Sequence, residues 1–488
     1  MKNISIVLIA FFFYSCNGQP KNDASVVVHP NDIISEGYLG NGFEWDPYQL
    51  DYGHGRMEIS EADKQKIYSR LDFMQPKLIR VMTNTTSLMR DGKLAPETNF
   101  DDIAWILNYC QSRGVTVLFG DWGGRITNIR ENTINENLIA AAAQYVDFLI
   151  NQKGYSCIKY YNMINEPNGT WSSTQGNFSI WARAMKAFYA EVEKLNLTSK
   201  LSMIGPDAAI WTDEEAWWID SCAVQLDYAI GLYDIHTYPT KIIVNSEKYS
   251  EIIGAYKSRV PAGKKIVMAE IGFKYGWDCE EDSLMYEENI RRIKTKKYAS
   301  LEDSQMFVYD HIYGIDMADA LFQTANVGYS GSVVWMLDDA MHTRGGRDKL
   351  KVWGFWNILG DEFFGAEEEI VRPWYYAWSL LTRSMPDGST ILRTEVSGDA
   401  LVKSIAVKKD NNRMISVLNV SKEAKRVHLQ CDEIKNWNNV SKYVYAEGTL
   451  IKEGDHMVLP NESNLQLSLD KGITIDMPAQ SLIIYTDF

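Results

Sequence analysis

The stretch IKYYNMINEP, residues 158 to 167, joins a short apolar run to a carboxylate at the point where the run stops. A second stretch, KIVMAE at 265 to 270, is built in the same way and ends at Glu270. Both runs have the length and the β-branched or aromatic content of buried strands. We therefore expect Glu166 and Glu270 to lie where a strand ends and a loop begins.

Strand-like runs of this kind alternate with helical segments along most of the chain. The expected strands are 38 to 44, 78 to 83, 115 to 120, 158 to 165, 201 to 205, 233 to 238, 265 to 270 and 331 to 337. The expected helices are 61 to 75, 101 to 113, 136 to 152, 178 to 195, 213 to 226, 246 to 259, 307 to 325 and 373 to 385. Ser60 is the expected N-cap of the first helix and Gly114 the stop of the second. Eight strand-then-helix units predict an α/β fold, a (β/α)8 barrel, although the glycines of the first strand suit a loop equally well.

The pattern changes after Arg383. Residues 389 to 488 carry short alternating runs such as LVKSIAV and RMISVLNV, separated by Gly, Asn and Asp. This texture predicts a C-terminal antiparallel β-sandwich, and a strand at 24 to 30 is a candidate to join it. We therefore expect a barrel at 30 to 386 and a sandwich at 389 to 488.

The first residues have the pattern of an export signal. Lys2 precedes the apolar run ISIVLIAFFFY, which is followed by Ser15 and Cys16. This order resembles a bacterial lipoprotein signal peptide at 1 to 15, with Cys16 lipidated as the mature N-terminus. Phe13 departs from the Leu usual in that signal, and the alternative is an ordinary signal peptide with an incidental Cys. The pattern predicts an exported protein of the cell envelope, an outer-membrane lipoprotein that meets the membrane only through its lipid anchor.

Composition and charge exclude several classes of function. The chain has 488 residues, 45% of them hydrophobic, and a formal net charge of −15. A charge of this sign opposes binding to nucleic acid and favours a neutral or basic substrate. The cysteines after Cys16 are odd in number and lack CxxC spacing, and no HExxH, Walker or GxSxG motif is present. We therefore expect no disulfide framework, no metal and no cofactor.

The barrel assignment gives the two glutamates a common location. Catalytic residues of such barrels lie at the carboxyl ends of the strands, and Glu166 and Glu270 follow the fourth and seventh expected strands. Two carboxyl groups that meet across one cavity are the parts needed for retaining hydrolysis of a glycosidic bond. Their surroundings would have to hold their pKa values apart.

Several motifs in this order resemble one enzyme group. Asn165-Glu166-Pro167 after strand four, His236-Thr237-Tyr238 after strand six, Glu270 after strand seven and Trp335 near the end of strand eight are similar to glycoside hydrolase clan A, the retaining, cellulase-like barrel glycosidases. The resemblance spans most of the chain.

The resemblance implies a role for each matching residue. Glu166 would be the general acid/base and Glu270 the nucleophile. The implied substrate contacts and supports are Asn165 on a sugar 2-hydroxyl, Arg80 and Tyr238 on Glu270, His236 beside the acid/base or a sugar hydroxyl, and Trp335 as a stacking platform. The alternatives are a structural ion pair for Arg80 and core packing for His236, Tyr238 and Trp335.

The loop after strand three departs from the cellulase-like pattern. Many clan members carry a His there, whereas this chain has Gly-Asp-Trp-Gly-Gly at 120 to 124. We expect Asp121 to bind a sugar hydroxyl and Trp122 to stack against the sugar or wall off the cleft.

The sequence thus predicts a retaining β-glycoside hydrolase that acts on a plant or microbial glycan through a covalent glycosyl-enzyme intermediate. The alternatives are a glycan-binding lipoprotein of the same fold without activity, and a transglycosylase. The sugar, the linkage and the choice between exo and endo cleavage stay open, because they depend on loop shape.

Overall fold

The computed structural model describes residues 22 to 48, 58 to 276, 279 to 344, 346 and 348 to 488. The expected signal segment at 1 to 15 and Cys16 lie outside the described residues. Within the described part, no helix combines the length and the apolar character that crossing a bilayer requires.

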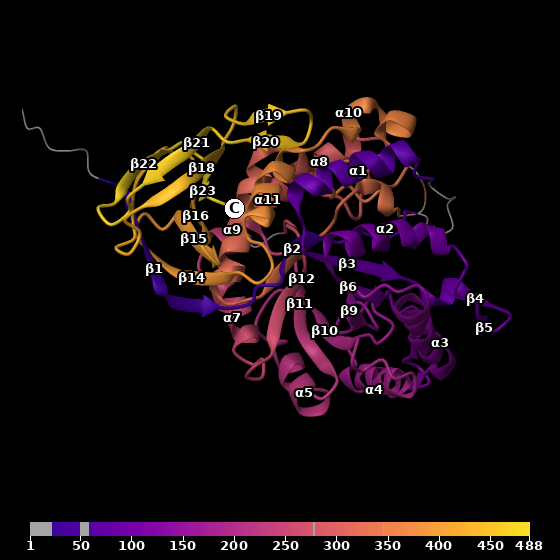
Figure 1. The fold of residues 1–488 in the computed structure, drawn as a ribbon. Helices are drawn as coiled ribbons and strands as arrows, with labels where there is room; N and C mark the ends of the chain where they lie inside the picture. Colours follow the sequence, from indigo (N-terminus) through magenta and orange to yellow (C-terminus); the bar gives the residue numbers. More distant parts are fainter. Residues whose placement is uncertain (1–21, 49–57, 277–278, 345, 347) are drawn as a thin grey trace, which may run out of the picture.

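Eight parallel strands form the central sheet (Figure 1). They are β2 (Gly40–Phe43), β3 (Leu78–Thr83), β6 (Thr116–Asp121), β9 (Ile158–Asn162), β10 (Ser202–Ile210), β11 (Ile230–Thr237), β12 (Lys265–Ile271) and β13 (Gly331–Val334), hydrogen-bonded in the order β2-β13-β12-β11-β10-β9-β6-β3. The two ends of this order meet, because Glu44, directly after β2, pairs in parallel with Arg80 of β3. The predicted (β/α)8 barrel is confirmed, including the first strand.

Helices surround the barrel in the alternation that the sequence predicts. Those between the strands are α1 (Glu61–Met74), α2 (Phe100–Arg113), α3 (Glu136–Asp147), α4 (Phe178–Lys194), α5 (Trp217–Gln225), α6 (Lys241–Asn245), α7 (Lys248–Lys257), α8 (Glu280–Thr295) and α9 (His311–Asn326), with α10 (Ala366–Glu369) and α11 (Pro373–Arg383) after β13. Ser60 caps α1 through a capping box with Asp63, and Gly114 ends α2 in the left-handed conformation. Both expected helix signals are confirmed.

The barrel interior holds apolar side chains below and polar side chains at the carboxyl end. Leu78, Leu232 and Val267 belong to one buried cluster inside the barrel. Arg80 lies two residues after Leu78, so the alternation of strand side chains turns it to the same interior. A register shift between β11 and β12 pairs His236 with Glu270 at the end of this layer.

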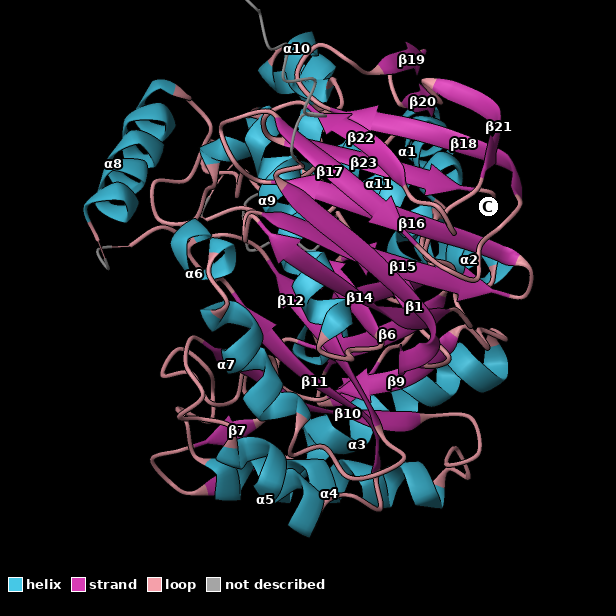
Figure 2. Ribbon diagram, turned by 90° about the vertical axis from the view of Figure 1, so that its left-hand side faces the viewer, coloured by secondary structure: helices cyan, strands magenta, loops and turns pink. Residues whose placement is uncertain are grey.

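A second sheet covers one side of the barrel (Figure 2). Its strands are β1 (Ala24–Ser35), β14 (Thr390–Gly398), β15 (Val402–Lys409), β16 (Asn412–Asn419), β17 (Lys425–Gln430), β18 (Trp437–Tyr445), β21 (Glu462–Leu467), β22 (Ile473–Met477) and β23 (Ser481–Thr486), in the order β21-β18-β23-β16-β15-β14-β1-β17-β22. All neighbours pair antiparallel except β1 and β17, which run parallel. One apolar cluster draws on strands from both halves of this order, including Val26, Val417 and Ile475, as two layers of a sandwich require.

Short elements decorate the loops. Three small hairpins pair β4 (Met89–Arg90) with β5 (Lys93–Leu94), β7 (Thr127–Asn128) with β8 (Thr133–Ile134) and β19 (Ile451–Glu453) with β20 (Met457–Leu459). The remaining turns of helix are η1 (Thr85–Leu88), η2 (Phe148–Gln152), η3 (Met306–Tyr309), η4 (Asp339–Met341) and η5 (Gly360–Phe364).

Helix α8 has no counterpart among the expected helices. It follows the loop after β12 and stands away from the rest of the molecule in Figure 2. Among its residues, only Asp282 and Ile293 are buried. Tyr286, Ile290 and Ile293 follow helical spacing, but charged residues predominate in this segment, so its apolar stripe is a weak signal.

Candidate active site

The two glutamates predicted from the sequence lie at one end of the barrel. Glu270 is near the end of β12, and Glu166 lies in the loop after β9, with a positive φ of 47°. Strand β9 ends at Asn162, earlier than expected, so bends carry the chain from the strand to Glu166. Both side chains line the same cavity of about 300 Å³.

Glu270 is held by a guanidinium and a phenol. Arg80, only 2% exposed, places Nη1 2.9 Å from Glu270 Oε2. The Tyr238 hydroxyl donates a short hydrogen bond to the other carboxylate oxygen, Oε1. These two contacts fix the orientation of the carboxylate.

Glu166 lies between an imidazole and an indole. His236 Nδ1 is 3.2 Å from Glu166 Oε1, and Trp171 Nε1 donates to Glu166 Oε2 at 2.7 Å. On its other side, His236 Nε2 lies 2.9 Å from Asp207 Oδ1. Asp207 also accepts the backbone N–H of Glu166 at 3.1 Å, so one buried carboxylate positions both His236 and the loop that carries Glu166.

The carboxyl groups of Glu166 and Glu270 are close neighbours. One carboxylate oxygen of each, together with a ring nitrogen of His236, lie within 4.8 Å of one another. His236 Nδ1 is also 3.6 Å from Glu270 Oε2, so the imidazole contacts both glutamates.

Electrostatics place a proton on the histidine. Burial lowers the pKa of His236, but the charges of Asp207 and Glu270 outweigh burial and raise this pKa well above its usual value. Burial raises the pKa of Glu166, yet the hydrogen bond and charge of His236 and the hydrogen bond of Trp171 lower it overall. The directions of these two pKa shifts favour a protonated His236 beside an ionised Glu166.

Three other expected site residues line the cavity. Asn165 Oδ1 accepts from Arg80 Nη2 at 2.7 Å, which leaves its side-chain NH₂ group to serve as a donor. Trp122 and Trp335 form part of the wall, with ring centres 6.2 Å apart. Trp335 is 4% exposed, and the His342 ring stacks on it, so little of its surface is free for a sugar.

Asp121 lies elsewhere. It is 1% exposed, and its two carboxylate oxygens accept the backbone N–H groups of Thr85 and Gly123 at 2.6 and 2.7 Å. The described residues that line the cavity do not include it. This carboxylate links two loops through their backbone N–H groups. Its position in the sequence does not reveal this structural role.

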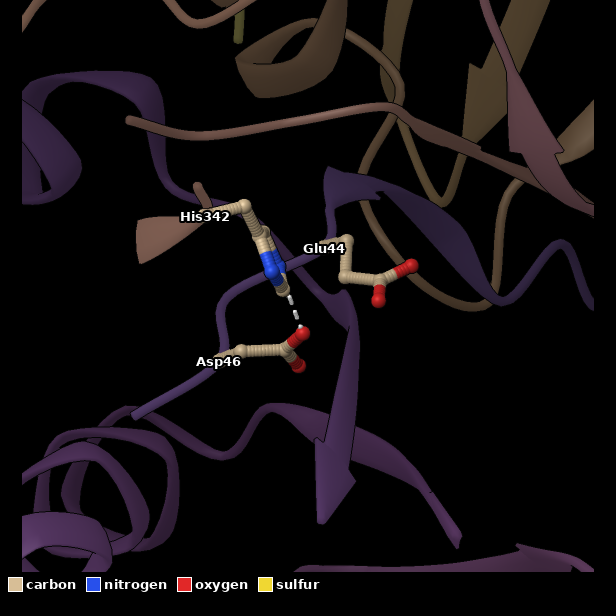
Figure 3. Close-up of side chains that lie close together, drawn as sticks. All are labelled: Glu44, Asp46 and His342. Atoms are coloured by element: carbon tan, nitrogen blue, oxygen red, sulfur yellow. Dashed lines mark ion pairs between the residues drawn. The ribbon is translucent and has the colours of Figure 1, made fainter. Parts of the chain in front are cut away.

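A second buried cluster adjoins the site. Figure 3 shows His342 pointing toward Asp46, with Nε2 2.9 Å from Oδ2, and Glu44 beside them. Glu44 Oε2 accepts from Arg80 Nη1 at 2.6 Å, so the cluster continues into the contacts of Glu270. Burial raises the pKa of Glu44 well above its usual value, although the charge of Arg80 opposes this. Glu44 is thus paired with Arg80, and Asp46 with His342.

Several residues of the site were not predicted. Asp207 lies two residues after the expected strand 201 to 205, and β10 in fact continues to Ile210. A carboxylate next to a strand end is the signal that identified Glu166, and it applies equally to Asp207. Lys274 and Asp303, which also line the cavity, carry no such signal.

Comparisons with known proteins identify the fold. No family model and no curated protein sequence matches the chain. A GH30 endoxylanase from Clostridium papyrosolvens has a TM-score of 0.63 at 13% identity, over 95% of this chain and 99% of that one. A GH39 β-xylosidase from Caulobacter crescentus has a TM-score of 0.57 at 12% identity, over 95% and 99%. A conserved exported protein from Bacteroides fragilis has a TM-score of 0.61 at 10% identity, over 95% and 100%.

GH30 and GH39 are both families of clan A, so the predicted resemblance is confirmed at the level of the fold.

Proposed function

We propose that this protein is a retaining glycoside hydrolase. The observation that carries the proposal is the spacing of Glu166 and Glu270, whose nearest carboxylate oxygens are within 4.8 Å at the carboxyl end of one barrel. Retaining glycosidases need carboxyl groups roughly 5–5.5 Å apart, whereas inverting enzymes need about 6.5–9.5 Å to admit a water molecule. The short spacing favours double displacement.

In the first step Glu270 is the nucleophile. Its carboxylate forms a bond to the anomeric carbon as the glycosidic bond breaks, and the leaving oxygen takes a proton from Glu166. Arg80 and Tyr238 orient the attacking carboxylate through the contacts described above. Asn165 donates to the sugar 2-hydroxyl, a contact that strengthens as positive charge develops at the neighbouring carbon.

His236 is the source of the proton that Glu166 donates to the leaving oxygen. Because the imidazolium holds the proton in the free protein, it passes from Nδ1 to Glu166 across the 3.2 Å hydrogen bond, and from Glu166 to the leaving oxygen. In the second step water attacks the glycosyl ester of Glu270. Glu166 accepts the proton of that water and returns it to His236, which restores the initial state.

The proposed substrate is a β-linked glycan of plants or microbes. The chain shares its fold with proteins named as xylanases and a β-xylosidase, so xylan is the first polysaccharide to test. The rings of Trp122, Trp171 and Trp211 border the cavity and offer apolar faces to sugar rings. Export with a lipid on Cys16 would give the enzyme access to such polymers.

Covalent trapping tests the proposal. A panel of 2-deoxy-2-fluoro aryl β-glycosides should label the wild-type protein on the peptide that contains Glu270, and mass spectrometry should locate the sugar on that residue. Glu270→Gln should take no label, while Glu166→Gln should still be labelled by substrates with activated leaving groups, which need no acid. Glycan binding with no turnover and no label on any member would instead support the binding-protein alternative.

A further inference from the structure

One side of the cavity is cationic. Among the described residues that line it, Lys274, Arg344 and Lys351 surround a single carboxylate, Asp303. Asp303 Oδ2 lies 3.1 Å from Lys351 Nζ and 3.4 Å from Arg344 Nη2. One carboxylate facing three cations leaves this wall with an excess of positive charge, in a chain whose net charge is −15.

The wall lies beside the reacting carboxylate. Lys274 Nζ is 4.3 Å from the centre of the Tyr238 ring, and the hydroxyl of that ring donates to Glu270. The ammonium is therefore close to the sugar unit that Glu270 attacks. Lys274 and Arg344 are exposed, so both can reach a ligand in the cavity.

The catalytic carboxylates have other cationic partners. Arg80 pairs with Glu270, and the His236 imidazolium pairs with Glu166, both from the buried side. Arg344 and Lys351 of the wall pair with Asp303 instead, and Lys274 and Arg344 are exposed to the open cavity. Their placement fits a negative charge that arrives with the ligand.

We infer that this wall binds an acidic substituent, the carboxylate of a uronic acid or a sulfate ester, on the sugar in or next to the cleavage position. The inference rests on the proposed hydrolase function and narrows its substrate class. Arg344 offers a planar pair of donors that match a carboxylate or sulfate, and Lys274 offers a compact charge. The overall negative charge favoured a neutral or basic substrate, but this wall of the cavity carries charge of the opposite sign.

Matched substrate pairs test the inference. One pair is a glucuronic acid-containing oligosaccharide and its carboxyl-reduced form, and the other is a sulfated galactan oligosaccharide and its desulfated form. Wild type should cleave the charged member of one pair at least about tenfold more efficiently in kcat/KM, which is the scale of one charge-assisted hydrogen bond. The pair that shows the preference distinguishes a carboxylate from a sulfate.

The wall is then removed one charge at a time. Lys274→Met and Arg344→Met should each reduce the charged-to-uncharged ratio of kcat/KM several-fold. Lys471→Met, at an exposed lysine in the C-terminal part of the chain, is the matched control and should leave the ratio as in wild type. If the wall only balances the catalytic carboxylates, Lys274→Met will change both members of a pair equally, and the inference is overturned.

Binding and cleavage measured on the same substrate pairs distinguish a failure of this inference from a failure of the hydrolase proposal. Equal cleavage of both members of every pair overturns the acidic-substrate inference and leaves the hydrolase proposal intact. If no pair is cleaved but calorimetry shows at least tenfold tighter binding of a charged member, the hydrolase proposal fails and the anion site stands. Binding without charge preference, with no cleavage, overturns both.

Discussion

Replacing Asp207 by Asn should shift the pH dependence of activity. The Asp207 carboxylate is the leading charge that raises the pKa of His236, and its Oδ1 lies 2.9 Å from His236 Nε2. An Asn side chain can still hydrogen-bond a neutral imidazole, so the geometry is preserved while the charge is lost. His236 should then release its proton at lower pH.

The size of the shift follows from the ion pair between Asp207 and His236 that is lost. A hydrogen bond to a charged group contributes about 1.5–3 kcal/mol, and one pKa unit corresponds to about 1.36 kcal/mol, so the shift should be about 1–2 units. The basic limb of the kcat/KM profile reports the proton that His236 and Glu166 share. Since removal of Asp207 lowers the pKa of the pair, this limb should move toward lower pH, with activity lost first on the alkaline side.

The assay is kcat/KM for an aryl β-glycoside that the wild type cleaves, measured from acidic to alkaline pH. Asp234→Asn is the matched control, because burial and the charge of Asp207 raise the pKa of Asp234 well above its usual value and keep this neighbour neutral. Its replacement removes no charge and should move the limb little. A folded Asp207→Asn variant with the wild-type basic limb would refute the assignment of the proton to His236.

Two further substitutions test the supports of the nucleophile. Arg80→Met leaves Glu44 and Glu270 buried without their common cation, so the free energy of unfolding in urea should fall by about 3–5 kcal/mol. An unchanged unfolding midpoint would contradict that pairing. Tyr238→Phe removes one charge-assisted hydrogen bond, and kcat/KM should fall about tenfold to a hundredfold with little change in melting temperature. Tyr233→Phe is the control, because Tyr233 lies on β11 and its hydroxyl bonds Asp227, in the turn before that strand. This variant should retain wild-type kcat/KM.

The barrel could be predicted because its strands are buried on both faces. Runs such as IKYYNMIN and KIVMAE carry continuous apolar character between loop signals, and the intervening helices carry an apolar stripe. Helix α8 was missed because charged residues outnumber its apolar ones, although Met285 and Ile290 pack against the core. Apolar periodicity detects the buried face of a helix, so it gives a weak signal where a helix is largely solvent-exposed.

The site could be predicted only where strand ends coincide with motifs. Glu166 and Glu270 follow clear apolar runs, and the structure brings them together. Asp207 was missed because β10 continues past the expected strand end, through a register shift beside Pro206. Asp121 occupies a comparable strand end yet turns to backbone amides, because the orientation of a loop carboxylate depends on tertiary contacts that one strand does not specify.

The position of β1 ties the beginning of the chain to its end. β1 lies between β14 and β17, with Ala24 opposite Gly398 on one side and Val427 on the other. During synthesis this strand leaves the ribosome first, and both of its neighbours follow only after the whole barrel has been made. Both edges of β1 therefore stay unpaired while the barrel is synthesised. A chain that ended after the barrel would leave them unpaired permanently. The second sheet is therefore not an appendage that can be trimmed away, and a shortened version for expression would need to lose β1 as well.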